Sequence, residues 1–289
     1  MRYLLPLVLL ALASCQPKAN YLLDNCSEIR DLRTGELLTP RQAFKADGCY
    51  GCIQADLFES RQTISFVRYR PEKFYTTVVA SEREAADSTS ALCLGAEALA
   101  GINGSYFNVD SLITTCFLKD DGNVIGETAP SEYDRTNAVL TLSETQFNID
   151  ECDTTAVFAG ADACWEVMVS GPILIDEGQA VEYTQEMVPG RWKRFYIKRH
   201  PRSMVGREAD GTTWLVVVDG RVKGEADGMT IAEMTELSKM LGLRDAINLD
   251  GGGSSTLWTL QGGVLNHPVD NHQFDHFGQR QVPNVLIVR

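Results

Sequence analysis

The amino-acid sequence predicts an α+β fold: one domain with a mixed, largely antiparallel sheet, a few packed helices and an N-terminal extension. Many short segments are apolar or alternate between apolar and polar residues, as strands do, whereas only two segments carry a clear helical pattern. Strand and helix patterns do not alternate regularly, which argues against a barrel of eight repeated units.

The first fifteen residues are typical of an export signal. Arg2 precedes an apolar run over residues 4–12, which is too short to span a bilayer. Cys15 follows Leu12-Ala13-Ser14, resembling the bacterial lipobox, although an ordinary signal peptide cut nearby is the alternative. We expect Cys15 to be lipidated and the chain to be exported to the bacterial cell envelope, on the periplasmic or surface side. Its only membrane contact would be this lipid.

Residues 16–60 are expected to form a tether and N-terminal extension, with a short helix opening at Thr39-Pro40, and residues 61–289 the main domain. Turn and periodicity signals predict its elements in order. They are a helix at 88–98 and strands at 63–70, 74–80, 138–142, 165–170, 172–175, 246–249, 256–260 and 285–288. Asp210-Gly211 predicts the turn of a hairpin spanning residues 204–219.

The clearest helix begins at Thr230. Thr230 and Glu233 have the spacing of a capping box, and Gly242 is suited to a left-handed cap at the other end. The predicted buried stripe consists of Ile231, Met234, Leu237 and Leu241.

Composition excludes some partners. The apolar fraction of 44% is ordinary for a globular enzyme, but the net charge is −13. Such an acidic chain is unsuited to nucleic acid or to acidic lipid surfaces. It still permits a phosphorylated substrate, because a few arginines in a pocket outweigh the global charge locally.

Eight cysteines are many for this length, and export accounts for them. With Cys15 lipidated, seven remain, all before residue 165, and the odd number leaves at least one unpaired. Cys49 and Cys52 have C-x-x-C spacing, but no second such motif follows. Structural disulfides are therefore predicted, with a redox motif or zinc knuckle as the alternative.

Three consecutive glycines follow a predicted buried strand in Asn248-Leu249-Asp250-Gly251-Gly252-Gly253-Ser254-Ser255. A loop without Cβ atoms lets backbone N–H groups approach an anion closely. The alternative is a tight glycine turn capped by Asp250. A second acid, Asp219, ends the strand of residues 214–218 in the same way, and Arg202 precedes the hairpin. We expect the two acids to share one sheet edge.

Three histidines, His267, His272 and His276, fall within ten residues together with Asp270 and Asp275. Their spacing fits neither the H-E-x-x-H helix nor a zinc finger. We expect a polar loop near the pocket and no cofactor, with a catalytic metal as the alternative.

Five motifs in order resemble those of the phosphodiester glycosidase family, whose members include the mannose-6-phosphate uncovering enzyme. The resemblance covers residues 62–289. Its motifs are Asn103-Gly104-Ser105-Tyr106-Phe107, Ser170-Gly171-Pro172-Ile173-Leu174, Pro201-Arg202-Ser203-Met204-Val205-Gly206, the eight residues Asn248 to Ser255, and Gly278-Gln279-Arg280-Gln281-Val282-Pro283-Asn284.

The resemblance implies hydrolysis of a sugar-1-phosphate diester at the anomeric carbon, with a carbohydrate phosphodiester as substrate. By position it implies the site residues Asn103, Gly104, Arg202, Asp219, Asp250, Gly252, Gly253, Ser254, Arg280 and Asn284. We assign Asp250 to stabilise or attack the anomeric centre and Asp219 to activate water. Arg202, Arg280 and the loop amides would hold the phosphate, while Asn103 and Asn284 would orient sugar hydroxyls.

The chain departs from the family pattern at Ser105, Tyr106 and Gln279, where glycine, phenylalanine and glutamate are usual. The first sixty residues have no recognised counterpart. Two other functions remain open: a module that binds glycan phosphates without turnover, and a metal-dependent phosphodiesterase that cuts the P–O bond.

Overall fold

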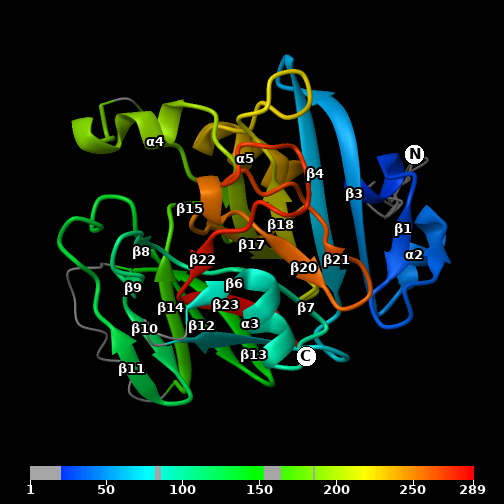
Figure 1. Cartoon of the computed structure of the whole chain (residues 1–289), viewed down its shortest axis with the longest axis horizontal. Coiled ribbons are helices and arrows are strands. Elements are labelled where there is room, and N and C mark those ends of the chain that lie inside the picture. Colours follow the sequence, from blue (N-terminus) through cyan, green and yellow to red (C-terminus); the bar gives the residue numbers. More distant parts are fainter. Residues whose placement is uncertain (1–20, 82–85, 153–163, 185) are drawn as a thin grey trace, which may run out of the picture.

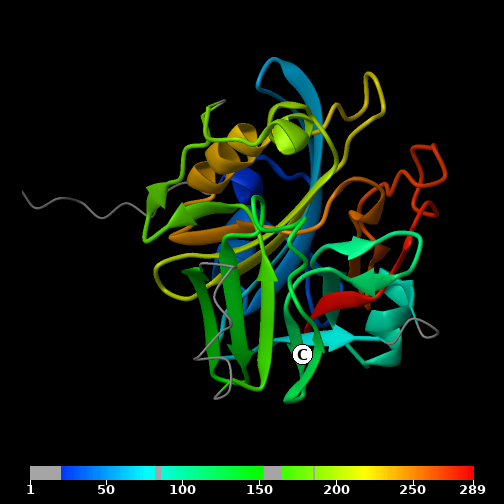
Figure 2. The same cartoon turned by 90° about the vertical axis from the view of Figure 1, so that its left-hand side faces the viewer.

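The computed structural model describes residues 21–81, 86–152, 164–184 and 186–289. The predicted lipobox at Cys15 lies outside these residues. A nine-stranded sheet forms the centre, with helices on one face and two five-stranded sheets, side by side, on the other (Figures 1 and 2). The α+β class is confirmed. Every ladder between named strands in the described residues is antiparallel, so the predicted mixed character is limited to one isolated parallel bridge.

The central sheet has the strand order β16-β15-β19-β17-β18-β4-β3-β1-β2. Its strands are β1 (Ile29–Asp31), β2 (Leu37–Leu38), β3 (Gly48–Leu57), β4 (Ser60–Tyr69), β15 (Ile173–Asp176), β16 (Gln179–Ala180), β17 (Arg202–Arg207), β18 (Thr213–Val218) and β19 (Asp245–Asn248).

One five-stranded sheet consists of β11 (Asn123–Gly126), β10 (Leu118–Asp120), β14 (Glu166–Ser170), β12 (Ala138–Ser143) and β13 (Gln146–Glu151). The other consists of β21 (Gly263–Val264), β20 (Leu257–Thr259), β7 (Ala100–Asn103), β23 (Asn284–Val288) and β5 (Thr76–Ala80). Two short pairs complete the strands: β22 (Gln281–Val282) with β6 (Asp87–Ser88), and β8 (Phe107–Asn108) with β9 (Ile113–Thr114).

The described α-helices are α1 (Tyr21–Asn25), α2 (Pro40–Lys45), α3 (Thr89–Gly95), α4 (Lys193–Ile197) and α5 (Ile231–Met240). The capping box predicted at Thr230 is present, and the short helix predicted at Thr39-Pro40 also begins with a capping box. Gly242 has φ +73°, as a left-handed cap requires. Helix α5 packs its apolar stripe on the central sheet.

Strand β18 shows why the centre of the sheet is apolar throughout. Trp214, Val216 and Val218 face the cluster that contains α5, whereas Leu215 and Val217 face the two smaller sheets. Because both faces are covered, the strand has no polar side, and its sequence is a continuous apolar run. The rigid sheet edge that follows β18 positions the site described below.

The N-terminal extension contributes strands β1, β2 and β3 to the central sheet. Residue 61 lies one position inside β4, at the turn of the β3–β4 hairpin. Leu22, Leu23 and Ile29 are at most 1% exposed and pack in the same apolar cluster as α5. Their burial makes residues 21–60 a structural element instead of a tether.

Six described cysteines have free thiols in the structure: Cys26, Cys49, Cys52, Cys93, Cys116 and Cys164. The predicted disulfides are therefore not formed among these six residues. Cys49 and Cys52 lie within β3, in a ladder with β4. That strand geometry differs from the helix-opening redox motif and from a zinc knuckle. In the described part of the chain, no helix has the length and apolarity of a membrane span.

Candidate active site

Two neighbouring strand ends bring the predicted acids to one edge of the central sheet. Strands β18 and β19 both pair antiparallel with β17, one on each side, so their carboxyl ends lie at the same edge. Asp219 directly follows β18, and Asp250 follows β19 by two residues. The N–H of Gly252 donates to the carbonyl of Pro201 at 2.9 Å, which ties the glycine loop to the start of β17.

Asp250 is partly buried at the base of the glycine loop. Burial raises the pKa of its carboxyl group. Hydrogen bonding from Ser254, the charge of Arg135, the Gly251 amide and the charge of Arg280 oppose this shift. The Gly251 N–H donates to Oδ1 at 2.9 Å. The result is a partly buried carboxyl group close to the positive charges of Arg135 and Arg280.

The glycine loop forms a turn of 3₁₀-helix over Gly252–Ser254, with Gly252 at φ +67°. A Cβ atom on Gly253 would lie 2.7 Å from Cζ of Arg280 and closer still to its Nη2. A Cβ atom on Gly252 would lie 2.9 Å from Nη2 of Arg221. Only glycine therefore lets two guanidinium groups lie directly against the loop backbone.

Arg221 was not assigned a role from the sequence. Burial lowers the pKa of Arg221, and the charge of Arg280 lowers it further, while Asp270 and Asp250 raise it. Arg280 is paired with Asp270, Nε to Oδ1 at 3.0 Å, whereas Arg221 has no hydrogen bond or ion pair within the described ranges. Two neighbouring guanidinium groups of which one lacks a counter-ion favour an anion between them.

A third cation, Arg135, also contributes to the electrostatics of Asp250. Its Cζ is 3.6 Å from the ring centroid of Tyr106 and 4.0 Å from that of Trp192, and it is paired with Glu132. Burial raises the pKa of both Asp250 and Tyr106, and the charge of Arg135 opposes this shift in each. No motif around residue 135 predicted this role, because the arginine comes from the loop before β12 and is brought close only by the fold.

Arg202, predicted to hold phosphate, is 1% exposed beneath α4. Its Nε donates to the carbonyl of Met229 at 2.8 Å, and its Nη2 donates to the carbonyls of Phe195 and Lys198 at 2.5 and 3.1 Å. Burial lowers its pKa to about 10. These bonds connect the α4 region to the segment before α5. Two of the three guanidinium nitrogens of Arg202 therefore donate to backbone carbonyls.

Asn103, Gly104 and Asn284 form the floor under the loop. Asn103 donates from Nδ2 to the Asp250 carbonyl at 2.7 Å, and its Oδ1 accepts from Ser203 Oγ at 2.7 Å and from a backbone amide at 3.1 Å. A Cβ atom on Gly104 would overlap Oδ1 of Asn284, which accepts from the Ser105 N–H at 2.7 Å. These residues fix the position of Asp250 through its backbone.

Both carboxylate oxygens of Asp219 are already engaged. Oδ1 accepts from Nδ2 of Asn266 and from the backbone N–H of His267, both at 3.0 Å. Oδ2 lies 3.0 Å from the same N–H and 2.8 Å from Nδ1 of the His267 ring. Asn266 also donates to the carbonyl of Ser255, which links Asp219 to the end of the glycine loop. Asp219 therefore orients His267.

The His267 ring is held on a second side by aromatic contacts. It stacks on Phe274 with centroids 3.8 Å apart and lies 4.4 Å from the ring of His276. His272 is exposed and has φ +59°. No three His, Cys, Asp or Glu side chains in the described ranges are grouped as metal ligands would be. The histidine segment is a polar loop beside Asp219.

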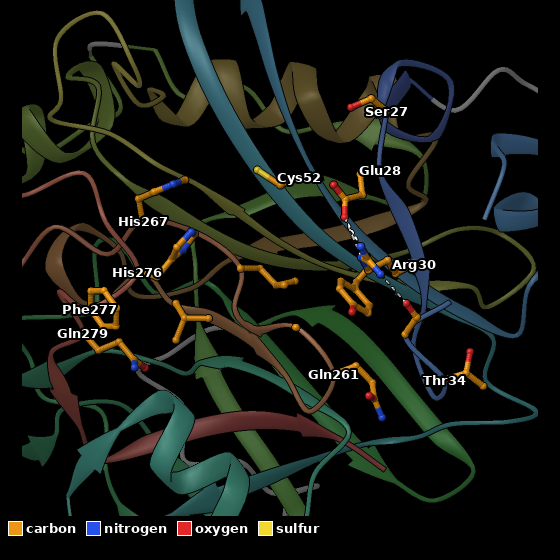
Figure 3. A pocket seen from close by; sticks show the side chains of 16 residues that line it. Ser27, Glu28, Arg30, Thr34, Cys52, Gln261, His267, His276, Phe277 and Gln279 are labelled. Carbon is orange, nitrogen blue, oxygen red and sulfur yellow. Dashed lines mark hydrogen bonds and ion pairs between the residues drawn. The ribbon is translucent and has the colours of Figure 1, made fainter. Parts of the chain in front are cut away.

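A cavity of about 870 Å³ opens beside this loop (Figure 3). His267, His276, Phe277 and Gln279 line one end, and Glu28 and Arg30 of the N-terminal extension line the other. The cavity thus adjoins the Asp219–His267 pair but is not itself lined by the glycine loop.

A family model described as "Phosphodiester glycosidase" matches residues 96–289. The chain belongs to this family. The matched range contains every predicted site residue from Asn103 to Asn284, and the family is one of glycosidase-type hydrolases. The matched range begins at residue 96, whereas the resemblance found in the sequence begins at residue 62.

Two curated relatives are named N-acetylglucosamine-1-phosphodiester alpha-N-acetylglucosaminidase. The mouse protein is 34% identical over 120 residues, covering 41% of this chain and 23% of the mouse protein. The human protein is 33% identical over 120 residues, with the same coverage of each chain. The matched part is thus less than a quarter of the length of either relative.

Two solved structures share the fold. The zebrafish catalytic domain of the same named enzyme, auto-inhibited by its pro-peptide, has a TM-score of 0.67 at 16% identity and covers 94% of this chain and 93% of that one. A hypothetical protein from Synechocystis has a TM-score of 0.59 at 16% identity, covering 84% and 62%. At this identity the likeness establishes the fold alone.

Proposed function

We propose that the chain hydrolyses sugar-1-phosphate diesters at the anomeric carbon. The observation that carries this proposal is the placing of the Asp250 carboxyl group at the base of an amide-rich loop lined by the guanidinium groups of Arg221 and Arg280. A carboxyl group next to an anion site is what a glycosidase needs when its leaving group is a phosphate.

In this proposal Arg221, Arg280 and the amides of Gly252 and Gly253 hold the phosphate. Arg221 has its guanidinium group uncommitted among the described residues, and Arg280 can exchange its partner Asp270 for the substrate. Positive charge near the site also lowers the pKa of the His200 ring. Burial lowers its pKa to about 4, and the charges of Arg202 and Arg221 contribute to that shift. The site is therefore locally cationic in a chain of net charge −13.

The chemical step breaks the bond between the anomeric carbon and the phosphate oxygen, and the leaving phosphomonoester takes the electron pair. Asp250 lies against the positive charge that develops at the anomeric carbon. The oxygen of a water molecule forms the new bond to the anomeric carbon, and a proton of that water passes to a base. We assign that base to the His267 ring, since Asp219 has both oxygens engaged and acts by holding His267 in position.

Besides Asp219, three residues change role relative to the sequence-based assignment. Arg202 holds the α4 segment over the site, because its donors are bonded to backbone carbonyls. Asn103 fixes the backbone of Asp250. Asn284 is 1% exposed and accepts from the Ser105 N–H through Oδ1, so it supports the loop from beneath instead of orienting sugar hydroxyls.

A chromogenic sugar-1-phosphodiester assay tests the proposal. N-acetylglucosamine-1-phosphate diesters are the first choice of substrate, because the curated relatives are named for them. We expect turnover by the parent chain and near-complete loss in Asp250→Asn. The matched control is Asp56→Asn, whose side chain is 80% exposed on the β3–β4 hairpin and should leave activity unchanged. Tight substrate binding without turnover would instead indicate a binding module.

Export and lipidation complete the proposal. The segment with Cys15 predicts attachment to a membrane through an N-terminal lipid, so that the domain acts on glycans or glycoconjugates outside the cytoplasm. Metabolic labelling with a fatty-acid analogue should mark the parent chain and not Cys15→Ser. An unlabelled parent would contradict the anchor and leave the hydrolase proposal standing.

A further inference from the structure

We propose that helix α4 carries a docking surface for a linear polyanion, a flexible chain with several phosphate groups. The α4 surface consists of Lys193, Arg194 and Lys198. Residues 191–200 contain five lysines and arginines and no acid, although the whole chain has a net charge of −13. Such a local excess of one sign attracts the opposite charge. The link from this surface to the phosphate site rests on the proposed function, whereas the binding itself does not.

The three cations lie on the outer side of α4. Arg194 and Lys198 are four residues apart, which places them on one face, and Lys193 borders this face. All three side chains are exposed. Phe195 and Tyr196 point the other way, into the apolar cluster that covers the central sheet, and Tyr196 is 5% exposed. The helix therefore presents its charge to solvent and its rings to the core.

The cations of the α4 surface have no counter-ion. The arginines that flank them, Arg191 and Arg199, are each paired with an acid (Asp134 and Glu233, respectively) and fix the segment to the rest of the fold. None of the ion pairs among the described residues includes a cation of the α4 surface itself. The fold therefore does not use these three charges, and they remain available to an external anion.

The α4 surface leads along the chain into the phosphate site. Nη2 of Arg202 donates to the carbonyls of Phe195 and Lys198 at 2.5 and 3.1 Å, which holds the end of α4 in place. Three residues after Lys198, the carbonyl of Pro201 accepts from the N–H of Gly252 at 2.9 Å. The last cation of the surface is thus only three residues from a direct contact with the glycine loop.

Positive charge makes the same connection. Burial lowers the pKa of His200 to about 4, and the charges of nearby arginines, Arg221 and Arg194 among them, add to this shift. His200 is therefore within electrostatic range both of α4 and of the arginine beside Gly252. Burial and then the charge of Arg280 lower the pKa of Arg221. A path of positive potential thus runs from α4 past His200 to the glycine loop.

The charge distribution favours a single chain over an anionic bilayer. Screening limits each charge to about 8 Å at physiological ionic strength, so a thin chain along α4 meets the local cations and not the acidic remainder of the protein. A bilayer is a plane and would bring that remainder close to its own negative surface. In addition, α4 lies at one end of the long axis of the molecule, whereas β1 and α2 of the N-terminal extension lie at the other (Figure 1).

The test measures the binding of a fluorescently labelled poly(glycerol phosphate) chain to the full-length protein by fluorescence anisotropy. This probe has a phosphodiester in every unit but no sugar-1-phosphate, so the proposed hydrolysis does not consume it. We expect Kd to rise about tenfold in the triple variant Lys193→Gln, Arg194→Gln, Lys198→Gln. The difference between parent and variant should shrink as salt is added.

The matched control is the triple variant Arg41→Gln, Lys45→Gln, Lys73→Gln. It removes the same charge from three exposed cations that lie outside the α4 surface. It should bind the probe as the parent does. Both variants should keep the melting temperature of the parent, because all six side chains are exposed.

Several outcomes would overturn the proposal. They are no binding by the parent, an equal loss in both triple variants, or equal binding of neutral dextran. Tighter binding to vesicles of phosphatidylcholine and phosphatidylglycerol than to the polymer would identify a membrane surface instead; this arm uses Cys15→Ser to exclude the proposed lipid.

A competition experiment tests the path into the site. The polymer should inhibit hydrolysis of a sugar-1-phosphate methyl diester by the parent, and more weakly in the α4 triple variant. Hydrolysis without inhibition would overturn the path from α4 to the glycine loop. No hydrolysis at all would contradict the hydrolase, and the anisotropy result would still decide whether α4 binds the polyanion.

Discussion

The change Gly253→Ala tests the phosphate site with a single methyl group. A Cβ atom there would lie 2.7 Å from Cζ of Arg280 and closer to Asp270, which real structures do not tolerate. Both neighbours are side-chain ends that are 24% and 38% exposed, so they can move aside without unfolding the sheet. The expected change in the free energy of unfolding is within about 1 kcal/mol.

The expected loss of activity is larger. Moving Arg280 away from the loop removes one charge-assisted hydrogen bond to the phosphate, worth about 1.5–3 kcal/mol. At about 1.4 kcal/mol per factor of ten, kcat/KM should fall about 10- to 100-fold. The assay is the hydrolysis of the methyl diester of a sugar-1-phosphate, with the melting temperature measured in parallel.

Gly95→Ala is the matched control, because no atom lies within 4 Å of the new Cβ and φ is not positive. It should keep both activity and melting temperature. Full activity in Gly253→Ala would refute the phosphate site. A loss of activity accompanied by an equal loss of folded protein would show that the glycine is required only for the turn.

Three further predictions concern the support of Asp250, the Asp219–His267 pair and a half-buried carboxyl group in β14. Asn103→Ala leaves several buried hydrogen-bonding partners unsatisfied. It should lower the free energy of unfolding, measured by urea titration, by about 2–4 kcal/mol. A change below about 1 kcal/mol would contradict the role of Asn103 in holding the Asp250 backbone. His267→Gln should lower kcat by about 100-fold or more with little change in KM, and Asp219→Asn should produce a smaller loss of the same kind; unchanged kcat in both would exclude the pair from the chemistry. Burial raises the pKa of Glu166, whose carboxylate accepts from the Val78 N–H at 2.6 Å. The folded protein therefore binds this proton more tightly than the unfolded chain does. The free energy of unfolding should fall as the pH rises from about 4 through the raised pKa. Glu166→Gln keeps an acceptor and should flatten the melting temperature between pH 4 and 7; an unchanged slope would show that other groups cause it.

Local signals predicted much of the fold. The capping box at Thr230, the turn at Asp210-Gly211 and the apolar run of β18 depend on neighbours within a few residues, and the structure contains all three. Strand β3 was not predicted, because it is half-buried without regular alternation. Its pairing with β4 extends over ten residues, but it shows only in the folded sheet.

The candidate site was also predicted only in part from the sequence. Asp250 and the glycine loop were visible in the sequence, since consecutive glycines after a buried strand are uncommon. Arg135 and Arg221 were not, because a lone arginine carries no local signal of what the fold places beside it. The engagement of Asp219 with Asn266 and His267 joins segments 47 and 48 residues apart, and no spacing rule connects them.

The most direct test of the central claim follows the oxygen atom of water. The parent chain is incubated with a sugar-1-phosphate methyl diester in water enriched in oxygen-18, and both products are analysed by mass spectrometry. We predict the heavy oxygen on the anomeric carbon of the released sugar and none in the phosphomonoester, with no labelled product from Asp250→Asn. Heavy oxygen in the phosphate would show that the P–O bond is cut and would contradict this account.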